Sequence, residues 1–239
     1  MQSLIFAIQF LTRLPTPQVK DFNMSRLAAS ARWFPLVGLI IGAVLLAIAW
    51  PASCIDPWFA AWAALLGWAV VTGGLHLDGL ADISDALGAS HRDKEKLLAV
   101  LKDPHLGSFG VLTLIMHLSG KLILLMIVLR GANWAALVLI PAWARLGLLF
   151  WQTLPPLASG YGKSFSSDIP KHARWLWLAL LVAVSVWLAM PLLIAPFAIW
   201  LYRHWLQTRV GGMTGDFLGA GVELVEIVLL ASLLIGLVG

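Results

Sequence analysis

WFPLVGLIIGAVLLAIAW, residues Trp33–Trp50, contains no charged side chain. A membrane helix needs roughly 20 apolar residues, because the hydrocarbon core is about 30 Å thick and each helical residue rises about 1.5 Å. This stretch approaches that length and is predicted to be a membrane span. The whole chain agrees, since 60% of its 239 residues are hydrophobic and only 12% are charged. Soluble domains are roughly half apolar and a quarter charged.

Six further apolar stretches follow the first. They are Trp58–Leu75, Phe109–Leu129, Asn133–Leu154, Trp175–Met190, Leu192–Trp205 and Val222–Val238. Met190-Pro191 separates the two short ones, which we interpret as a tight helical hairpin rather than one span. The sequence therefore predicts an all-α, polytopic membrane bundle of about seven transmembrane helices. Residues 1–239 are expected to form a single membrane-embedded catalytic domain.

Basic residues set the expected orientation. Lys121 and Arg145 lie inside spans, and Arg130 lies in a loop on one side of the bundle. All other Lys and Arg fall on the opposite side when the seven spans alternate. Positively charged loops stay in the cytoplasm, so the N-terminus is predicted to be cytoplasmic. Of the twelve acidic residues, only Asp56 falls in an outer loop, which places the expected working face in the cytoplasm too.

An acidic stretch, Gly73–Ala86, carries the strongest chemical signal. Asp78, Asp82 and Asp85 stand at positions i, i+4 and i+7 and so share one face of a helix. Three neighbouring carboxylates repel each other, and a divalent cation would relieve that repulsion. Oxygen-only ligands favour Mg²⁺, Mn²⁺ or Ca²⁺ over zinc. A solvated acidic helix face is the alternative. His76 is interpreted either as a general base or as a structural hydrogen-bonding residue.

Two glycine-containing segments are candidates for anion binding. Lys102–Gly110 is a polar turn before the third span, and its backbone amides are placed to face an anion at a helix N-terminus. An ordinary capping loop is the alternative there. Gly211–Gly221 has five glycines in eleven residues, which allow close backbone approach to a ligand. Two glutamates, Glu223 and Glu226, follow it.

Two basic residues, Lys121 and Arg145, lie deep inside predicted spans. Such residues usually face the protein interior or a wet cavity and find a carboxylate or phosphate partner. Snorkelling to the membrane interface is the alternative. From the residues alone, these segments suggest a membrane site for metal-dependent transfer between phosphate-bearing substrates.

The motifs resemble those of the adenosylcobinamide-GDP ribazoletransferase family, also called cobalamin synthases. GGLHLDGLADISDAL resembles its acidic signature, KDPHLGSFG its lysine–aspartate loop, and GGMTGDFLGA its C-terminal signature. FLTRLPTP and FPLVGLIIG also fit, so the similarity runs along nearly the whole chain. Pro104-His105 departs from the Ser-Arg associated with that loop.

The resemblance implies a reaction and its participants. A hydroxyl of α-ribazole or its 5′-phosphate attacks the cobinamide-linked phosphorus of adenosylcobinamide-GDP, GMP leaves, and adenosylcobalamin or its phosphate forms. It implies Mg²⁺ held by Asp78, Asp82 and Asp85, with an aspartate of this set (Asp82 or Asp85) or His76 accepting the hydroxyl proton. The residues expected to bind substrate or its phosphates are Lys102, Asp103, Lys121, Arg145, Gly211, Gly212, Thr214 and Asp216, and Asp103 is also offered as a further metal ligand.

The resemblance also implies a location and partners. We expect the bacterial inner membrane, with the bilayer as a partner and the active site facing the cytoplasm. No nucleic-acid partner is expected, while self-association and association with other cobalamin-pathway enzymes are left open. Two other functions stay open at this point. A CDP-alcohol phosphotransferase of phospholipid synthesis also uses spaced aspartates, although its pattern expects Ala-Arg after Asp-Gly. An ion-coupled transporter would instead place its key charges near the bilayer midplane.

Overall fold

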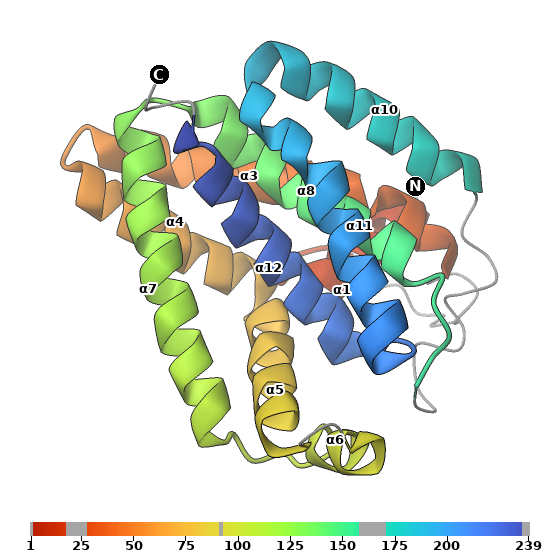
Figure 1. Cartoon of the computed structure of the whole chain (residues 1–239). Helices are drawn as coiled ribbons and strands as arrows, with labels where there is room; N and C mark the ends of the chain where they lie inside the picture. Colours follow the sequence, from red (N-terminus) through yellow and green to blue (C-terminus); the bar gives the residue numbers. More distant parts are fainter. Residues whose placement is uncertain (1, 18–27, 91–92, 158–170, 236–239) are drawn as a thin grey trace.

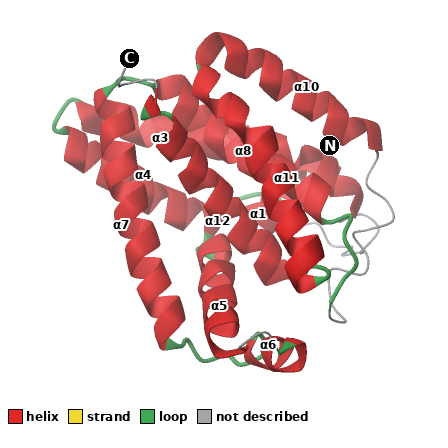
Figure 2. Ribbon diagram, viewed as in Figure 1, coloured by secondary structure: helices red, strands yellow, loops and turns green. Residues whose placement is uncertain are grey.

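The computed structural model describes residues 2–17, 28–90, 93–157 and 171–235 of the chain, and the regular structure there is helical throughout (Figures 1 and 2). The α-helices are α1 (Gln2–Leu11), α3 (Phe34–Ser53), α4 (Pro57–Thr72), α5 (Leu75–Ser90), α6 (Lys94–Val100), α7 (Ser108–Arg130), α8 (Trp134–Trp151), α10 (Lys171–Leu188), α11 (Ala195–Trp205) and α12 (Gly215–Ser232). Short 3-10 turns at Ala31–Trp33 and Met190–Ile194 and a π-turn at Leu206–Val210 join some of them. The predicted all-α class is confirmed.

Each of the seven predicted spans overlaps a helix, although Val222–Val238 is displaced relative to α12 and its last residues lie outside the described part. In the described part, three helical segments are long and apolar enough to cross a membrane: Ala28–Ser53, α7 and α8. A fourth is reached if α4 and α5, which meet at an angle of 87°, count as one broken span. The bundle is therefore that of a membrane protein, and the number of seven spans stays a prediction.

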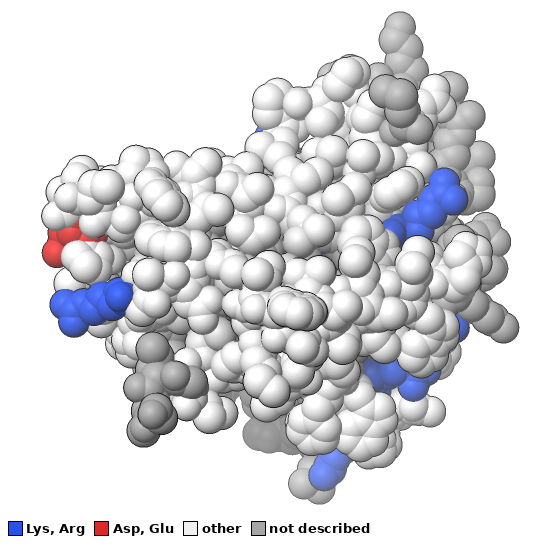
Figure 3. Space-filling view, turned by 90° about the horizontal axis from the view of Figure 1, so that it is seen from above, with Lys and Arg blue, Asp and Glu red and all other residues white. Residues whose placement is uncertain are grey.

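The surface agrees with a lipid environment. The view from above in Figure 3 is almost entirely uncharged, with Lys and Arg mostly toward its margins. Large apolar side chains are exposed along α7 and α10, among them Leu112, Met116 and Trp187, the last with 87% of its surface accessible. Such exposure is typical of a lipid-facing surface, because in water a protein rarely leaves so many large apolar groups uncovered.

Glycines allow the central helices to pack backbone against backbone. Gly38 and Gly42 of α3 lie so close to the backbone of α8 at Ala142 and Val138 that a Cβ would not fit. In Figure 1, α12 runs beside α8 on its other side. Residues of α8 are consequently buried on nearly all faces, including Trp143 and Trp151. This helix is the centre of the bundle.

The predicted hairpin is also present. α10 ends at Leu188, the chain reverses in the 3-10 turn Met190–Ile194, and α11 begins at Ala195. Both helices pack on α8 (Figure 1). Pro191 and Pro196 explain the break, because proline cannot donate the backbone hydrogen bond that a continuous helix needs. Trp175–Trp205 therefore contains two helices, as predicted, while its two membrane crossings stay a prediction.

A sharp bend between α4 and α5 positions the acidic stretch. Gly73 and Gly74 adopt φ values of 63° and 70°, a left-handed conformation that glycine adopts at little cost. The Arg13 side chain packs directly against Gly73. After the bend, α5 crosses α12 at two more glycines. A Cβ on Gly79 would lie 2.8 Å from the backbone oxygen of Asp216, and one on Gly219 would lie 3.3 Å from the Cα of His76.

Candidate functional site

Asp85, one of the three predicted metal ligands, is bound by backbone amides of the same chain. Its two carboxylate oxygens accept hydrogen bonds from Gly107 N (2.8 Å) and Gly110 N (2.9 Å) at the start of α7. The carboxylate also fills the space that a Cβ on either glycine would need. Asp85 therefore supplies the anion that complements this helix N-terminus. It occupies two of the amides that the sequence offered to a substrate phosphate.

Asp78 and Asp82 of α5 lie near Asp216, at the start of α12. We call these three residues the acidic cluster, and they lie outside the predicted spans. Burial, followed by the charges of Asp78, Asp216 and Asp85, raises the pKa of Asp82 to about 6. Burial also raises the pKa of Asp216, against the hydrogen bond from the Thr214 hydroxyl at 3.3 Å. The ion pairs found among the described residues include none to this cluster.

The acidic cluster has the donor chemistry for Mg²⁺, which commonly uses one or two carboxylates and fills its other positions with water and phosphate oxygens. As placed, no group of three or more His, Cys, Asp or Glu side chains in the described ranges converges closely enough to hold a metal ion. The predicted trio of Asp78, Asp82 and Asp85 is thus not assembled as a ready site. The crossing of α5 and α12 instead brings Asp216 toward Asp78 and Asp82.

A second set of charged residues is fully buried between α7, α8 and α12. Lys121 bonds to Glu223 at 2.8 Å and to Glu226 at 2.5 Å, and Arg145 pairs with Glu226. His117 contacts Glu223 at 2.8 Å. We call these five side chains the buried charge network. The Lys121 ammonium also lies 4.0 Å from the centre of the Trp68 ring, a favourable cation–π distance.

This network decides between the two interpretations of the intramembrane cations. Lys121 and Arg145 are 1% and 0% exposed, so snorkelling is excluded as their role. They do find carboxylate partners, as the sequence predicted, and those partners are the two glutamates that follow the glycine-rich segment. Their binding to substrate phosphate stays a prediction.

His76 connects the two sets of charges. It is buried at the start of α5, and its Nδ1 lies 3.3 Å from Nη2 of Arg145. It lines a cavity of about 240 Å³ together with Asp78, Asp216 and Gln152. Gln152 is 1% exposed, and its Oε1 has no hydrogen-bond partner among the described residues. A buried acceptor left unpaired costs about 1–3 kcal/mol. Nothing in the sequence singled out Gln152.

The loop before α7 holds two predicted phosphate-site residues near the surface. Lys102 and Asp103 are both exposed. Asp103 accepts bonds from the backbone amide of His105 (3.0 Å) and contacts its ring Nδ1 (2.6 Å), and these contacts lower the pKa of Asp103. The two residues therefore lie on an exposed turn, with Asp103 bonded inside it. Their role toward substrate stays a prediction.

The glycine-rich segment is only partly a loop. Among its glycines, Gly211 has a φ of 83°, whereas Gly215, Gly219 and Gly221 lie in α12. Gly212 packs against the backbone of Pro155, where Met213 N donates to Pro155 O at 3.0 Å. Thr214 caps α12 by accepting from Phe217 N at 3.4 Å. The non-helical part is Gly211–Thr214, shorter than predicted, and within it Gly212 and Met213 are buried.

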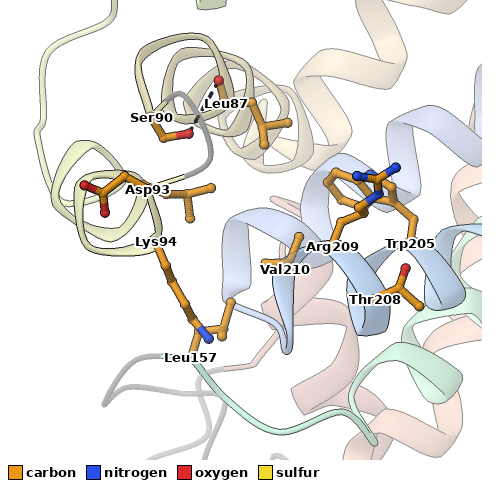
Figure 4. A pocket seen from close by; sticks show the side chains of 10 residues that line it. Leu87, Ser90, Asp93, Lys94, Leu157, Trp205, Thr208, Arg209 and Val210 are labelled. Carbon is orange, nitrogen blue, oxygen red and sulfur yellow. Dashed lines mark hydrogen bonds between the residues drawn. The ribbon is translucent and has the colours of Figure 1, made fainter.

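A larger pocket of about 550 Å³ lies between the ends of α5 and α11 and is seen in Figure 4. Lys94 reaches into it from α6, while Trp205, Thr208 and Arg209 line the opposite wall. Leu87 and Leu157 supply apolar surface. Neither Lys94 nor Arg209 was among the predicted site residues. The position of Arg209 two residues before Gly211 was the one sequence feature that could have indicated a site there.

The chain matches the family described as Cobalamin-5-phosphate synthase over residues 3–234. It is 55% identical to an adenosylcobinamide-GDP ribazoletransferase of Laribacter hongkongensis, over 95% of this chain and 93% of the relative. Proteins of the same name from Thiobacillus denitrificans and Novosphingobium aromaticivorans are 46% and 44% identical, over 93% and 98% of this chain and 91% and 97% of theirs. No solved structure matches it.

Proposed function

The chain belongs to the cobalamin-5-phosphate synthase family, and from that premise we propose that it is an adenosylcobinamide-GDP ribazoletransferase. It transfers the adenosylcobinamide-phosphate group to α-ribazole or its 5′-phosphate and releases GMP. This is the late step that assembles the nucleotide loop of cobalamin. The 55% identity to a relative of that name along almost the whole chain carries the proposal. Neither the phospholipid-synthesis nor the transporter alternative is needed.

The proposed reaction forms one bond to phosphorus and breaks another. A ribose hydroxyl oxygen forms a bond to the phosphorus attached to cobinamide. The bond between that phosphorus and the oxygen bridging to GMP breaks, and that oxygen leaves with GMP. The hydroxyl proton passes to a carboxylate of the acidic cluster. Since phosphoryl transfer depends mainly on positioning and charge neutralisation, the site needs few covalent participants.

The acidic cluster is the proposed metal site. Asp78 and Asp82, with Asp216 beside them, would hold Mg²⁺, which would neutralise charge on the diphosphate. The raised pKa of Asp82 supports this, because burial and the neighbouring carboxylates disfavour its charged form, and a bound cation would offset that cost. We assign Asp85 to holding the start of α7, since both its oxygens already accept amide bonds.

The remaining phosphate contacts are assigned by charge. Lys102 and the Gly211–Thr214 turn are proposed to hold diphosphate or GMP, and Lys94 and Arg209 add two further cations near that turn. An ideal Cβ on Gly211 would lie 3.4 Å from Nζ of Lys94. For Lys121 and Arg145 we replace the predicted phosphate contact by an indirect role, because both are buried and paired with glutamates, and we propose that they fix α12 and His76.

The membrane arrangement is proposed from charge. We propose seven spans in the inner membrane, a cytoplasmic N-terminus and an active site facing the cytoplasm, with residues 1–239 acting as one catalytic domain. The asymmetry of Lys and Arg supports this. A reporter fused after Gly239 should be active outside the cytoplasm. Cytoplasmic activity would contradict the seven-span topology.

The activity has a direct test. Purified protein in detergent is incubated with adenosylcobinamide-GDP, α-ribazole and Mg²⁺, and released GMP is measured. GMP should appear only when α-ribazole and Mg²⁺ are both present. Release of GMP at the same rate without α-ribazole would mean hydrolysis instead of transfer, and no release would contradict the proposed function.

A further inference from the structure

The cavity lined by Gln152 contains an unexplained polar group. Gln152 lies just after α8, its backbone amide donates to Leu148 O at 3.0 Å, and its side chain is almost fully buried. Its Oε1 accepts no hydrogen bond in the described part of the chain. Buried acceptors in folded proteins are nearly always paired, so this atom indicates that the cavity receives a hydrogen-bond donor from a ligand.

His76, on the same cavity, offers the complementary group. Arg145 has only donors, so its contact with Nδ1 of His76 at 3.3 Å makes that nitrogen an acceptor. The proton of the neutral ring then lies on Nε2. Arg145 is held in turn by its ion pair with Glu226, and this arrangement fixes the tautomer of the His76 ring. His76 therefore presents a donor to a ligand and is poorly suited to accept a proton at Nε2.

The other residues that line the cavity indicate the polarity and charge of the ligand. Apolar side chains form most of the wall, including Phe10, Leu11, Leu148 and Leu218. Besides the neutral His76, the ionisable side chains are two carboxylates, Asp78 and Asp216, and no Lys or Arg of the described residues lines the cavity. A phosphate is thus disfavoured inside it. A flat, uncharged, mostly apolar molecule with one acceptor and one hydroxyl fits about 240 Å³.

We infer that this cavity binds the acceptor nucleoside, an inference that rests on the proposed function. The apolar bicyclic base lies among the apolar side chains, its free ring nitrogen accepts from Nε2 of His76, and a ribose hydroxyl donates to Gln152. Any phosphate on the nucleoside points out of the cavity. The sugar then lies beside Asp78 and Asp216, where its attacking hydroxyl meets the acidic cluster.

The inference is tested with Gln152→Leu, which keeps approximate volume and removes the amide, and with Gln207→Leu as an exposed control. The KM for α-ribazole should rise about tenfold in Gln152→Leu, while the KM for adenosylcobinamide-GDP and the control stay unchanged. Without ligand, Gln152→Leu should melt no lower than wild type, because an unpaired acceptor is removed. His76→Phe, which keeps a ring without a donor, should raise the same KM.

Two results would overturn the inference. One is an unchanged KM for α-ribazole in both cavity variants. The other is a rise confined to the KM for adenosylcobinamide-GDP, which would assign the cavity to that substrate. If wild-type protein releases no GMP, the proposed function fails, and calorimetric binding of α-ribazole to wild type and Gln152→Leu still decides about the cavity. Equal binding, or none to either, would then refute it.

Discussion

The buried charge network and the acidic cluster share α12 but treat charge in opposite ways. Glu223 and Glu226 lie in the middle of α12 and pair with Lys121 and Arg145. Asp216, at the start of the same helix, faces Asp78 and Asp82, and no basic side chain pairs with the three in the described residues. The chain thus supplies its own countercharge at one place and leaves it to a ligand at the other.

This difference separates two roles for charged groups near a membrane. A buried ion pair with complete partners fixes the positions of its helices, and it is costly to break because an uncompensated charge remains. An uncompensated group of carboxylates weakens the metal-free protein and gains stability when a cation binds. Mutations in the buried charge network should therefore lower the stability of the protein, and mutations in the acidic cluster should lower its activity.

The largest effect is expected at Glu226. Glu226→Gln leaves Lys121 and Arg145 with one buried carboxylate between them, which should lower the free energy of unfolding by about 3–5 kcal/mol. Thermal unfolding in detergent measures it. The double variant Arg145→Gln/Glu226→Gln restores neutrality and should melt above Glu226→Gln. If Arg145→Met keeps wild-type stability and loses activity, Arg145 binds substrate phosphate and the structural role is wrong.

The next effect is on turnover. Asp78→Asn and Asp82→Asn should each lower turnover at least a hundredfold, since metal charge neutralisation is worth several kcal/mol and about 1.4 kcal/mol is tenfold. Both should raise the Mg²⁺ needed for half activity, and neither should lower the melting temperature of the metal-free protein. Asp56→Asn, a helix cap in a different loop, is the matched control. Wild-type turnover in both cluster variants would contradict the proposed metal site.

The pH dependence should sharpen the same contrast. The pKa of Asp82 is raised from its ordinary 3.8 to about 6, so between these values the metal-free folded protein holds a proton that the unfolded chain does not. Its unfolding free energy should therefore fall as pH rises through this range. Mg²⁺ must displace that proton. Below about pH 6, the Mg²⁺ concentration needed for half saturation should therefore rise up to tenfold for each unit by which the pH falls. Asp82→Asn should abolish this trend, and a trend that persists would assign it to another group.

The smallest effect is expected at Asp85. Asp85→Asn keeps one oxygen for the α7 amides and loses the charge, so stability should fall by about 1 kcal/mol and turnover by no more than a few-fold. Thermal unfolding and GMP release measure the two. A loss of turnover as large as that of Asp78→Asn would return Asp85 to the metal ligands.

Much of the fold could be predicted because apolar runs and prolines act locally. The stretch Trp33–Trp50 and the break at Pro191 both needed only neighbouring residues to interpret. The three-aspartate face was equally local, since α5 is a regular helix. That reasoning could not show that Asp85 faces amides 22 and 25 residues later, because this depends on how α7 returns beside α5.

Within the candidate site, the sequence could predict only what the type of a residue implies by itself. Intramembrane Lys121 and Arg145 were expected to find anions, but their partners lie 102, 105 and 81 residues further on. Gln152 follows a long apolar run and carries no charge, so only its burial without a partner reveals it. Helix packing, which no local pattern encodes, determines these contacts.

The buried charge network also affects how the protein is made. Lys121 and Arg145 precede Glu226 by 105 and 81 residues. At about 5–20 residues per second, α7 and α8 emerge roughly 4–20 seconds before the helix that neutralises them. The growing chain thus carries two unmatched cations until α12 arrives. A ribosome-bound chain lacking α12 should therefore remain with the insertion machinery, and release should follow synthesis of Glu226.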